Sequence, residues 1–242
     1  MRAGQEVCAA LVAVAAIAGC GKSESASSAT KVEPAPAGSG STAIKPTADG
    51  PFAAWDMAAR RAAWQGAHVT PGSSLGSKRA IDVRGDQVTV WDGKTEKAMT
   101  LDITSPCEAR FVEVGADGSR SSTTSHYTLK DGALLTGLGD AGTRRGKEAV
   151  ACVSNVVVTL DANGTCTQWK AAAFGDGRYE ASPGTCAWVD DGGQELLSVT
   201  VRDHETRLLV DGDALLTQQL QRTHSQAAAD FAAAKALRDG GG

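Results

Sequence analysis

Apolar and polar residues alternate in short runs through most of the chain after about residue 65. The runs "AIDVRG", "VTVWDG", "ARFVEV" and "LLSVTV" have a period of two, which is typical of strands that bury one face. Between such runs stand "WDGK", "KDGA", "DANG" and "VDGD", and Asp-Gly or Asn-Gly favours the positive φ that tight hairpin turns require. The pattern predicts an all-β fold, an antiparallel meander of about ten strands that forms a barrel or a sandwich.

Helical spacing of apolar residues is found only at the two ends of this region. In "PFAAWDMAARRAAW", residues 51–64, Phe52 and Trp55 begin a helical apolar pattern. The alanine-rich segment 225–239 begins at Ser225, a residue type that caps helices. We therefore expect a single β domain over 52–239 with a short flanking helix at each end. Parallel βαβ units are not expected, because no helix-length periodic segment separates the strands.

The first nineteen residues resemble an export signal. Arg2 is followed by the apolar run "VCAALVAVAAIA", which has the length of a secretory signal core and is too short to span a bilayer. "AIA", residues 16–18, is a pattern that signal peptidase cleaves. "IAGC", residues 17–20, resembles the bacterial lipobox, and that resemblance implies that Cys20 is acylated and becomes the N-terminus after removal of 1–19.

The number of cysteines favours the lipobox interpretation. The chain has six cysteines, of which Cys8 is removed with the signal. If Cys20 carries a lipid such as palmitate, four remain, an even number suited to disulfides in an exported protein: Cys107, Cys152, Cys166 and Cys186. The segment 20–51 is rich in Ser, Ala, Gly and Pro and is predicted to be a disordered tether. We expect a lipid-anchored protein of the cell envelope, at the periplasmic face or the outer membrane.

The four remaining cysteines suggest two disulfides. A hairpin that turns at Asp176 places residues opposite one another when their numbers sum to 352, as Cys166 and Cys186 do. Directly opposite cysteines in an antiparallel pair lie close enough for a disulfide. Cys107 and Cys152 then pair by elimination.

Motifs of known chemistry are weak in this sequence. "GLGDAG", residues 137–142, spells G-x-G-x-x-G, but a β-branched run follows instead of the helix that a dinucleotide site needs, so we interpret it as a glycine-rich hairpin loop. The histidines are scattered and no C-x-x-C spacing occurs, so no metal, cofactor or catalytic residue is predicted. "LKDGALLTG" at 129–137 and "LVDGDALLTQ" at 209–218 look alike, which we interpret as reuse of one hairpin type.

Tryptophan is unusually frequent among the aromatic residues. There are five Trp but only four Phe and two Tyr. "AWQGAHV" and the later "TRLLVDGDALLTQQLQRT" resemble the two ends of a lipocalin or calycin barrel, although the family's order is Gly-x-Trp and this chain reads Trp-x-Gly. The resemblance implies that Trp64 closes one barrel end and is covered by Arg222 or Arg207. The alternative is that the aromatic residues simply fill a sandwich core.

Three functions are compatible with these sequence features. The formal net charge of −4 gives no reason to expect a nucleic-acid partner. The leading hypothesis is a non-catalytic module that binds a small apolar ligand inside a barrel, and an interior filled by side chains would count against it. The second is an interaction or inhibitor module that binds an envelope protein. The third is an envelope hydrolase with Ser, His and acid side chains in one cleft.

Overall fold

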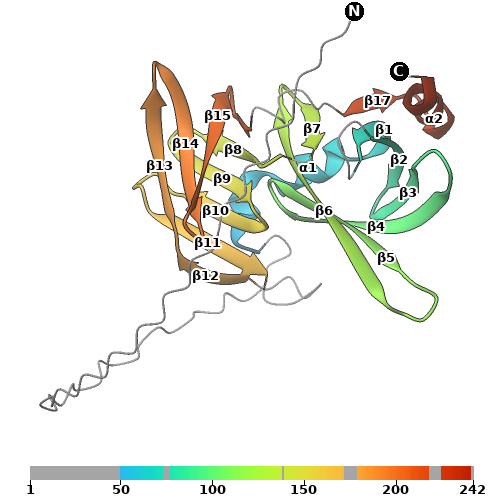
Figure 1. The fold of residues 1–242 in the computed structure, drawn as a ribbon, viewed down its shortest axis with the longest axis horizontal. Coiled ribbons are helices and arrows are strands. Elements are labelled where there is room, and N and C mark those ends of the chain that lie inside the picture. The colour runs from blue at the N-terminus through green and yellow to red at the C-terminus, as the bar shows by residue number, and fades with distance from the viewer. Residues whose placement is uncertain (1–49, 73–76, 138, 172–178, 218–224, 241–242) are drawn as a thin grey trace, which may run out of the picture. The chain divides into compact units, whose positions relative to one another are not determined.

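Antiparallel β-sheets account for most of the described residues of the computed structural model, which are 50–72, 77–137, 139–171, 179–217 and 225–240 (Figure 1). All of them belong to one compact unit, Gly40–Gly242. The predicted all-β class is confirmed. The strands are more numerous than expected, because some turns have no Asp-Gly or Asn-Gly signal. Ser154-Asn155 and Arg202-Asp203 take positive φ without any glycine, at 49° to 66°.

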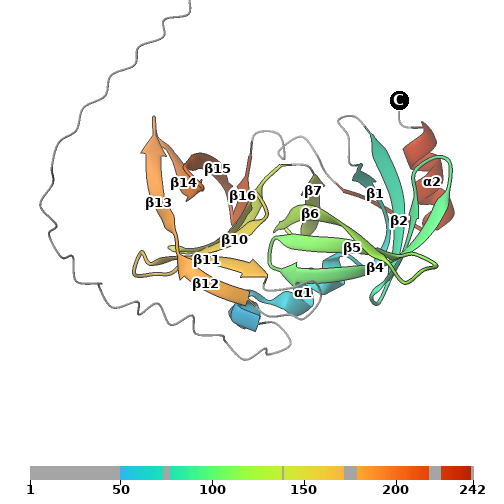
Figure 2. The same ribbon diagram turned by 60° about the horizontal axis from the view of Figure 1, so that its bottom comes forward.

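Sheet A consists of eight strands in the order β17-β1-β2-β3-β4-β5-β6-β7. Its strands are β1 (Gly66–Pro71), β2 (Lys78–Arg84), β3 (Gln87–Trp91), β4 (Glu96–Ser105), β5 (Glu108–Val114), β6 (Arg120–Lys130), β7 (Ala133–Gly137) and β17 (Gln226–Ala228). The sheet is curled (Figure 2), and its two edges approach where the Ser225 N–H donates to the Leu134 carbonyl at 3.3 Å. Its inner face is filled by a cluster of buried side chains: Trp64, Ile81, Val83, Val88, Val90, Leu101, Ala109, Phe111, Tyr127 and Leu134.

Sheet B consists of nine strands in the order β12-β11-β10-β9-β8-β16-β15-β14-β13. Its strands are β8 (Ala141–Arg145), β9 (Glu148–Val153), β10 (Val156–Leu160), β11 (Cys166–Ala171), β12 (Tyr179–Pro183), β13 (Thr185–Asp191), β14 (Gln194–Val201), β15 (His204–Asp211) and β16 (Ala214–Leu216). It has its own filled core of Ala149, Ala151, Val153, Val158, Leu160, Leu197, Val199, Val201, Leu208 and Leu215. The meander is therefore divided between two curled sheets.

The two outer strands of sheet B are consecutive in the chain. β12 continues into β13 through Gly184 (Figure 2), and the Gly184 N–H donates to the Cys166 carbonyl at 2.9 Å. A Cβ on Gly184 would lie 2.8 Å from the Cys166 Sγ, so only glycine allows this close approach. The sheet is thus drawn together at one end.

The N-terminal helical segment is broken into two helices. η1 (Gly50–Trp55) is a 3₁₀-helix and α1 (Met57–Ala63) is an α-helix. Between them Asp56 has a left-handed backbone at φ 48°, and its side chain accepts from the Ala59 N–H at 3.1 Å as the cap of α1. This break corrects the predicted continuous helix over 51–64. It lets Phe52 pack beside Cys152 of sheet B, while Trp64 enters the core of sheet A.

The C-terminal helix begins later than the sequence predicts. α2 spans Phe231–Gly240, and Asp230 rather than Ser225 caps it, since the Asp230 carboxylate accepts from the Ala233 N–H at 2.8 Å. Residues 226–228 instead pair with β1 as β17, because they satisfy the backbone groups of that sheet edge. α2 packs on the outer face of β1 and β2 through the fully buried Ala234 and the partly buried Phe231. Neither this helix nor any other in the described residues has the length and apolarity needed to cross a bilayer.

Candidate functional site

The structure contains both cysteine pairs that the sequence predicts, Cys107–Cys152 and Cys166–Cys186. The predicted register of the second pair is wrong by two residues. β11 and β12 pair with Thr167 opposite Pro183, so Cys166 lies opposite Gly184, and Cys186 follows on β13. The disulfide therefore joins β11, the strand next to one edge of sheet B, to β13 at the other edge, instead of two strands of one hairpin. Cys20 lies outside the described residues.

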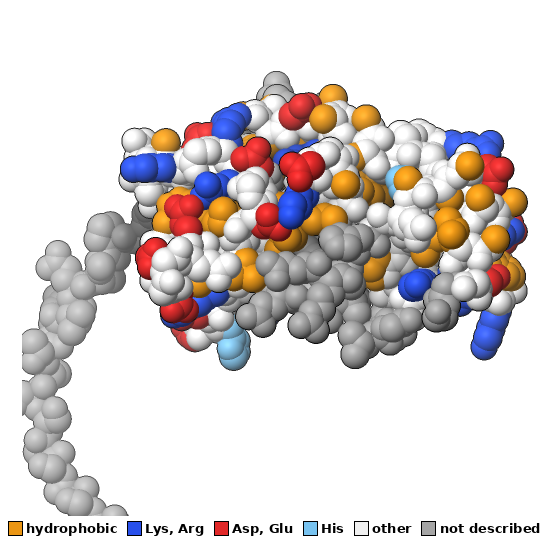
Figure 3. All heavy atoms as spheres, turned by 90° about the horizontal axis from the view of Figure 1, so that it is seen from above, with side chains coloured by type: hydrophobic (Ala, Val, Ile, Leu, Met, Phe, Trp, Pro, Cys, Tyr) orange, Lys and Arg blue, Asp and Glu red, His pale blue; other side chains and the backbone are white. Residues whose placement is uncertain are grey.

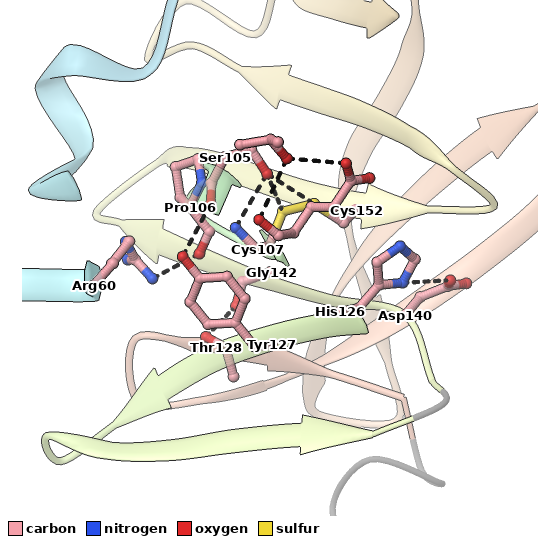
Figure 4. Close-up of a disulfide and its surroundings, with 12 residues drawn as sticks. Arg60, Ser105, Pro106, Cys107, His126, Tyr127, Thr128, Asp140, Gly142 and Cys152 are labelled. Carbon is pink, nitrogen blue, oxygen red and sulfur yellow. Dashed lines mark hydrogen bonds and ion pairs between the residues drawn. A yellow bond between two sulfur atoms is a disulfide. The ribbon is translucent and has the colours of Figure 1, made fainter. Parts of the chain in front are cut away.

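The disulfide Cys107–Cys152 is the centre of a buried joint between the sheets (Figure 4). Ser105 Oγ lies 3.3 Å from Cys152 Sγ. The Tyr127 hydroxyl donates to the Ser105 carbonyl at 3.0 Å, and Arg60 Nη1 donates to the Pro106 carbonyl at 2.8 Å. Burial raises the pKa of the Tyr127 hydroxyl well above its ordinary value, so Tyr127 remains a donor. The joint holds the turn between β4 and β5 against β9.

Trp64 lies in the core of sheet A, and Arg207, one of the two arginines predicted to cover it, lies in the other sheet. Its side chain is fully buried in sheet A and packs edge-on against Phe111 and Tyr127, with ring centroids 5.8 and 5.5 Å away. Arg207 lies on β15 of sheet B, where it pairs with Glu205 and Asp191. Glu205 and Asp191 hold the Arg207 guanidinium on sheet B, so Arg207 does not cover Trp64. Arg222 lies outside the described residues.

The glycine-rich motif is a crossover between the sheets and not a hairpin loop. Gly137 ends β7 of sheet A, and Gly142 lies in β8 of sheet B. The Gly142 carbonyl accepts from Thr128 Oγ1 at 2.6 Å (Figure 4). A Cβ on Gly142 would lie 2.5 Å from the Val150 carbonyl oxygen. Gly142 is thus required by close packing of strands, so this glycine of the motif is explained without a nucleotide.

Titratable groups of the described residues do not gather into a metal site. These residues contain no group of three or more His, Cys, Asp or Glu side chains placed to hold an ion. His126 Nδ1 lies 3.5 Å from Asp140 Oδ1 (Figure 4). This contact ties β6 of sheet A to the crossover that leads into β8 of sheet B.

A cleft of about 500 Å³ lies where turns of the two sheets meet. Its walls come from η1 and the start of α1, the β6–β7 turn, the end of β8 and the β15–β16 turn. The two turns are the look-alike sequences "KDGA" and "VDGD", and Lys130 Nζ of one lies 2.6 Å from Asp211 Oδ2 of the other. The carboxylate raises the pKa of Lys130 through this hydrogen bond. The sequence shows that the two turns are similar, but it does not show that they lie side by side in the fold.

The basic side chains around the cleft already have partners within the protein, which are carboxylates for Lys130, Arg144 and Arg145 and backbone carbonyls for Arg60. Arg144 pairs with Glu195 at 2.5 Å and Arg145 with Glu148 at 2.7 Å. The Arg145 guanidinium also lies 5.0 Å from the Trp55 ring centroid. By contrast, Asp131 and Asp213 are exposed at the rim, and the described part of the structure gives neither carboxylate an ion-pair partner. The exposed charges of the cleft that have no ion-pair partner among the described residues are therefore negative.

Charges of both signs are mixed over the molecular face that Figure 3 shows, with apolar side chains between them. Among the described residues, the large apolar side chains that are strongly exposed are Val114 and Leu237. Comparison with protein-family models, with curated proteins and with solved structures gave no match. The function must therefore be inferred from the residues of this chain.

Proposed function

We propose that this protein is a lipid-anchored, non-catalytic interaction module of the cell envelope that binds a basic segment of a protein partner in the cleft between its sheets. The observation that carries the proposal is the pair of look-alike turns, one from each sheet, that meet around a cleft where two exposed carboxylates have no ion-pair partner among the described residues. An ammonium or guanidinium group beside Asp131 or Asp213 would form charge-assisted hydrogen bonds.

The packing of the two sheets favours a partner at the surface over an apolar ligand inside. The inward-facing core residues of both sheets are at most 6% exposed, so side chains occupy the space that an apolar ligand would need. The cleft is instead lined by Lys, Arg and Asp side chains, which suits a charged partner. Its volume of about 500 Å³ lies within the usual range of ligand sites.

The envelope location is supported by the N-terminal sequence and the two disulfides. Two disulfides are typical of oxidising compartments, and "IAGC" at 17–20 resembles a lipobox. A diacylated or triacylated Cys20 would hold the protein stably at a membrane. The denaturing mass of the protein purified from its own envelope tests this directly. An acyl mass on Cys20 is expected, and an unmodified chain that begins at Gly19 would contradict the anchor.

Site-specific photo-crosslinking tests the cleft. A photoreactive residue in place of Ala54, which is exposed and lines the cleft, is expected to give one discrete protein adduct in cells. The crosslinked partner peptide should contain Lys or Arg near the linked residue. Asp131→Asn with Asp213→Asn removes both charges, and Asn tolerates the left-handed backbone of Asp131, φ 52°. This double variant should lose the adduct.

Asp203→Asn is the matched control. Asp203 is also an exposed aspartate with a left-handed backbone, φ 66°, in the β14–β15 turn of sheet B, and it does not line the cleft. The adduct should persist in this variant. An adduct that survives in the Asp131 and Asp213 double variant, or one that contains a small molecule in place of a protein, would refute the proposed function.

A further inference from the structure

Arg79 is a cation on the inner face of a sheet. It is the second residue of β2, and side chains along a strand alternate between faces. Ile81, two residues on, lies in the inner core of sheet A. The intervening Ala80 packs on the outer face, in the cluster that includes Ala234 of α2. Arg79 therefore points inward, and its guanidinium carbon lies 5.3 Å from the centre of the Phe111 ring.

The donors of Arg79 are largely unused. Arg79 Nε is buried and has no hydrogen-bond partner. Nη2 makes one long contact, 3.5 Å, to the Pro71 carbonyl. No carboxylate of the described residues forms an ion pair with this guanidinium, and burial lowers the pKa of Arg79. A partly buried cation without a counter-charge is unfavourable, and five N–H donors in a planar fork suit an oxyanion.

Thr70 supplies a second unused polar group at the same place. It lies directly opposite Arg79 in the β1–β2 pair, and opposite residues of an antiparallel pair project from the same face. Thr70 is 2% exposed, and its Oγ1 has no hydrogen-bond partner. A buried hydroxyl without a partner is itself costly. Arg79 and Thr70 thus present unused donors side by side at the hairpin end of β1 and β2.

Arg60 shows that this arrangement is not general for buried arginines of the chain. Arg60 is 8% exposed, and its Nε and Nη1 donate to the Trp55 and Pro106 carbonyls at 3.0 and 2.8 Å. The two arginines differ in whether their N–H donors have hydrogen-bond partners, and not in burial alone. Arg60 is held by the protein, whereas Arg79 has donors left for another molecule.

We propose that Arg79 and Thr70 form a binding site for a single carboxylate group, separate from the cleft between the sheets. The two oxygens of a carboxylate match the guanidinium fork, while the Thr70 hydroxyl donates a further hydrogen bond. One negative charge balances the one cation present, whereas a phosphate dianion would leave an excess charge in a partly buried place. The carboxylate belongs either to a small organic acid or to the C-terminus of a peptide.

The test observes the Arg79 side chain directly in the full chain. The Nε–Hε resonance of Arg79, assigned by its absence in Arg79→Lys, is followed by ¹H–¹⁵N NMR during addition of sodium acetate. Sodium chloride and sodium phosphate at equal ionic strength are the controls, and an N-acetylated amino acid represents a peptide C-terminus. We expect a saturable shift of this resonance with acetate and with the N-acetylated amino acid, and weaker binding of phosphate. Tighter binding of acetate would indicate a small organic acid, and tighter binding of the N-acetylated amino acid would indicate a peptide C-terminus. No saturable shift, or equal binding of chloride, would overturn the site.

Variants separate binding from a structural role. Arg79→Lys should weaken acetate binding at least about tenfold, because it loses the fork. Thr70→Val should weaken it about three- to tenfold, and Thr70→Ser should restore it. Arg79→Met should not lower the Tm without acetate, since it removes an unpaired charge, and should abolish the rise in Tm that acetate produces. Arg60→Met, which removes a satisfied guanidinium, should lower the Tm. An Arg79→Met variant that keeps the acetate response would refute the proposal.

Discussion

Removal of the disulfide Cys107–Cys152 is expected to destabilise the protein more than removal of Cys166–Cys186. The first disulfide closes a sequence separation of 45 residues and the second one of 20. Loop-closure entropy of the unfolded chain then gives about 4 kcal/mol for the first and about 3 kcal/mol for the second. Cys107 and Cys152 are also fully buried, whereas Cys166 and Cys186 are only partly buried. Removal of the two buried sulfur atoms leaves a cavity, which further increases the stability lost with the first disulfide relative to the second.

The assay is guanidinium chloride unfolding of Cys107→Ala with Cys152→Ala, and of Cys166→Ala with Cys186→Ala, followed by tryptophan fluorescence. The two loops do not overlap in sequence, so the quadruple variant should lose about 7 kcal/mol, a large part of the stability of an ordinary domain. A Cys166–Cys186 deletion that costs as much as the Cys107–Cys152 deletion, or more, would refute the reasoning from loop length and burial.

Two further predictions concern the tyrosines and one glycine. Tyr127 and Tyr179 are the two tyrosines of the chain. Burial raises the pKa of both hydroxyls, that of Tyr179 to about 12. Because the folded chain favours the neutral hydroxyls, their contribution to the free energy of unfolding is intact below about pH 10 and is lost as the pH rises towards 12. Absorbance at 295 nm should therefore show tyrosinate only together with loss of circular dichroism, and tyrosinate in a chain that is still folded at pH 10 would contradict this. Gly142→Ala should cost about 1–3 kcal/mol in thermal unfolding, because its Cβ would lie 2.5 Å from the Val150 carbonyl oxygen. Gly240→Ala, whose Cβ meets nothing within 4 Å, should be close to neutral, and equal effects of the two would refute the clash.

The sequence predicts local features of this fold well. Asp-Gly and Asn-Gly mark turns whose geometry is decided within four residues, as at Asp131-Gly132 between β6 and β7. The division into two sheets is not predictable in this way, because a period-two pattern shows that a strand has a buried face but not which core that face joins. The crossover between Gly137 and Gly142 looks like any glycine-rich loop.

The candidate sites were visible only in part. The cleft depends on Lys130 meeting Asp211, 81 residues away, and no local pattern encodes that contact. Arg79 did leave a signal, since in "RAIDVR" it stands at the spacing of Ile81 and Val83 and is therefore a charge at an inward position. Its lack of an ion-pair partner among the described residues could be known only once Thr70 and Phe111 were placed around it.

The connectivity of the sheets also sets an order of assembly. Every strand of sheet B lies between residues 141 and 216, while sheet A is interrupted and receives β17 and α2 only after sheet B has been passed. As the chain emerges from its N-terminus, sheet B can finish once Leu216 has emerged. Until Phe231 and Ala234 arrive, the outer sides of Ala80 and Trp91 remain uncovered. Sheet B is in effect an insertion within sheet A, so the part of the molecule that starts first is completed last.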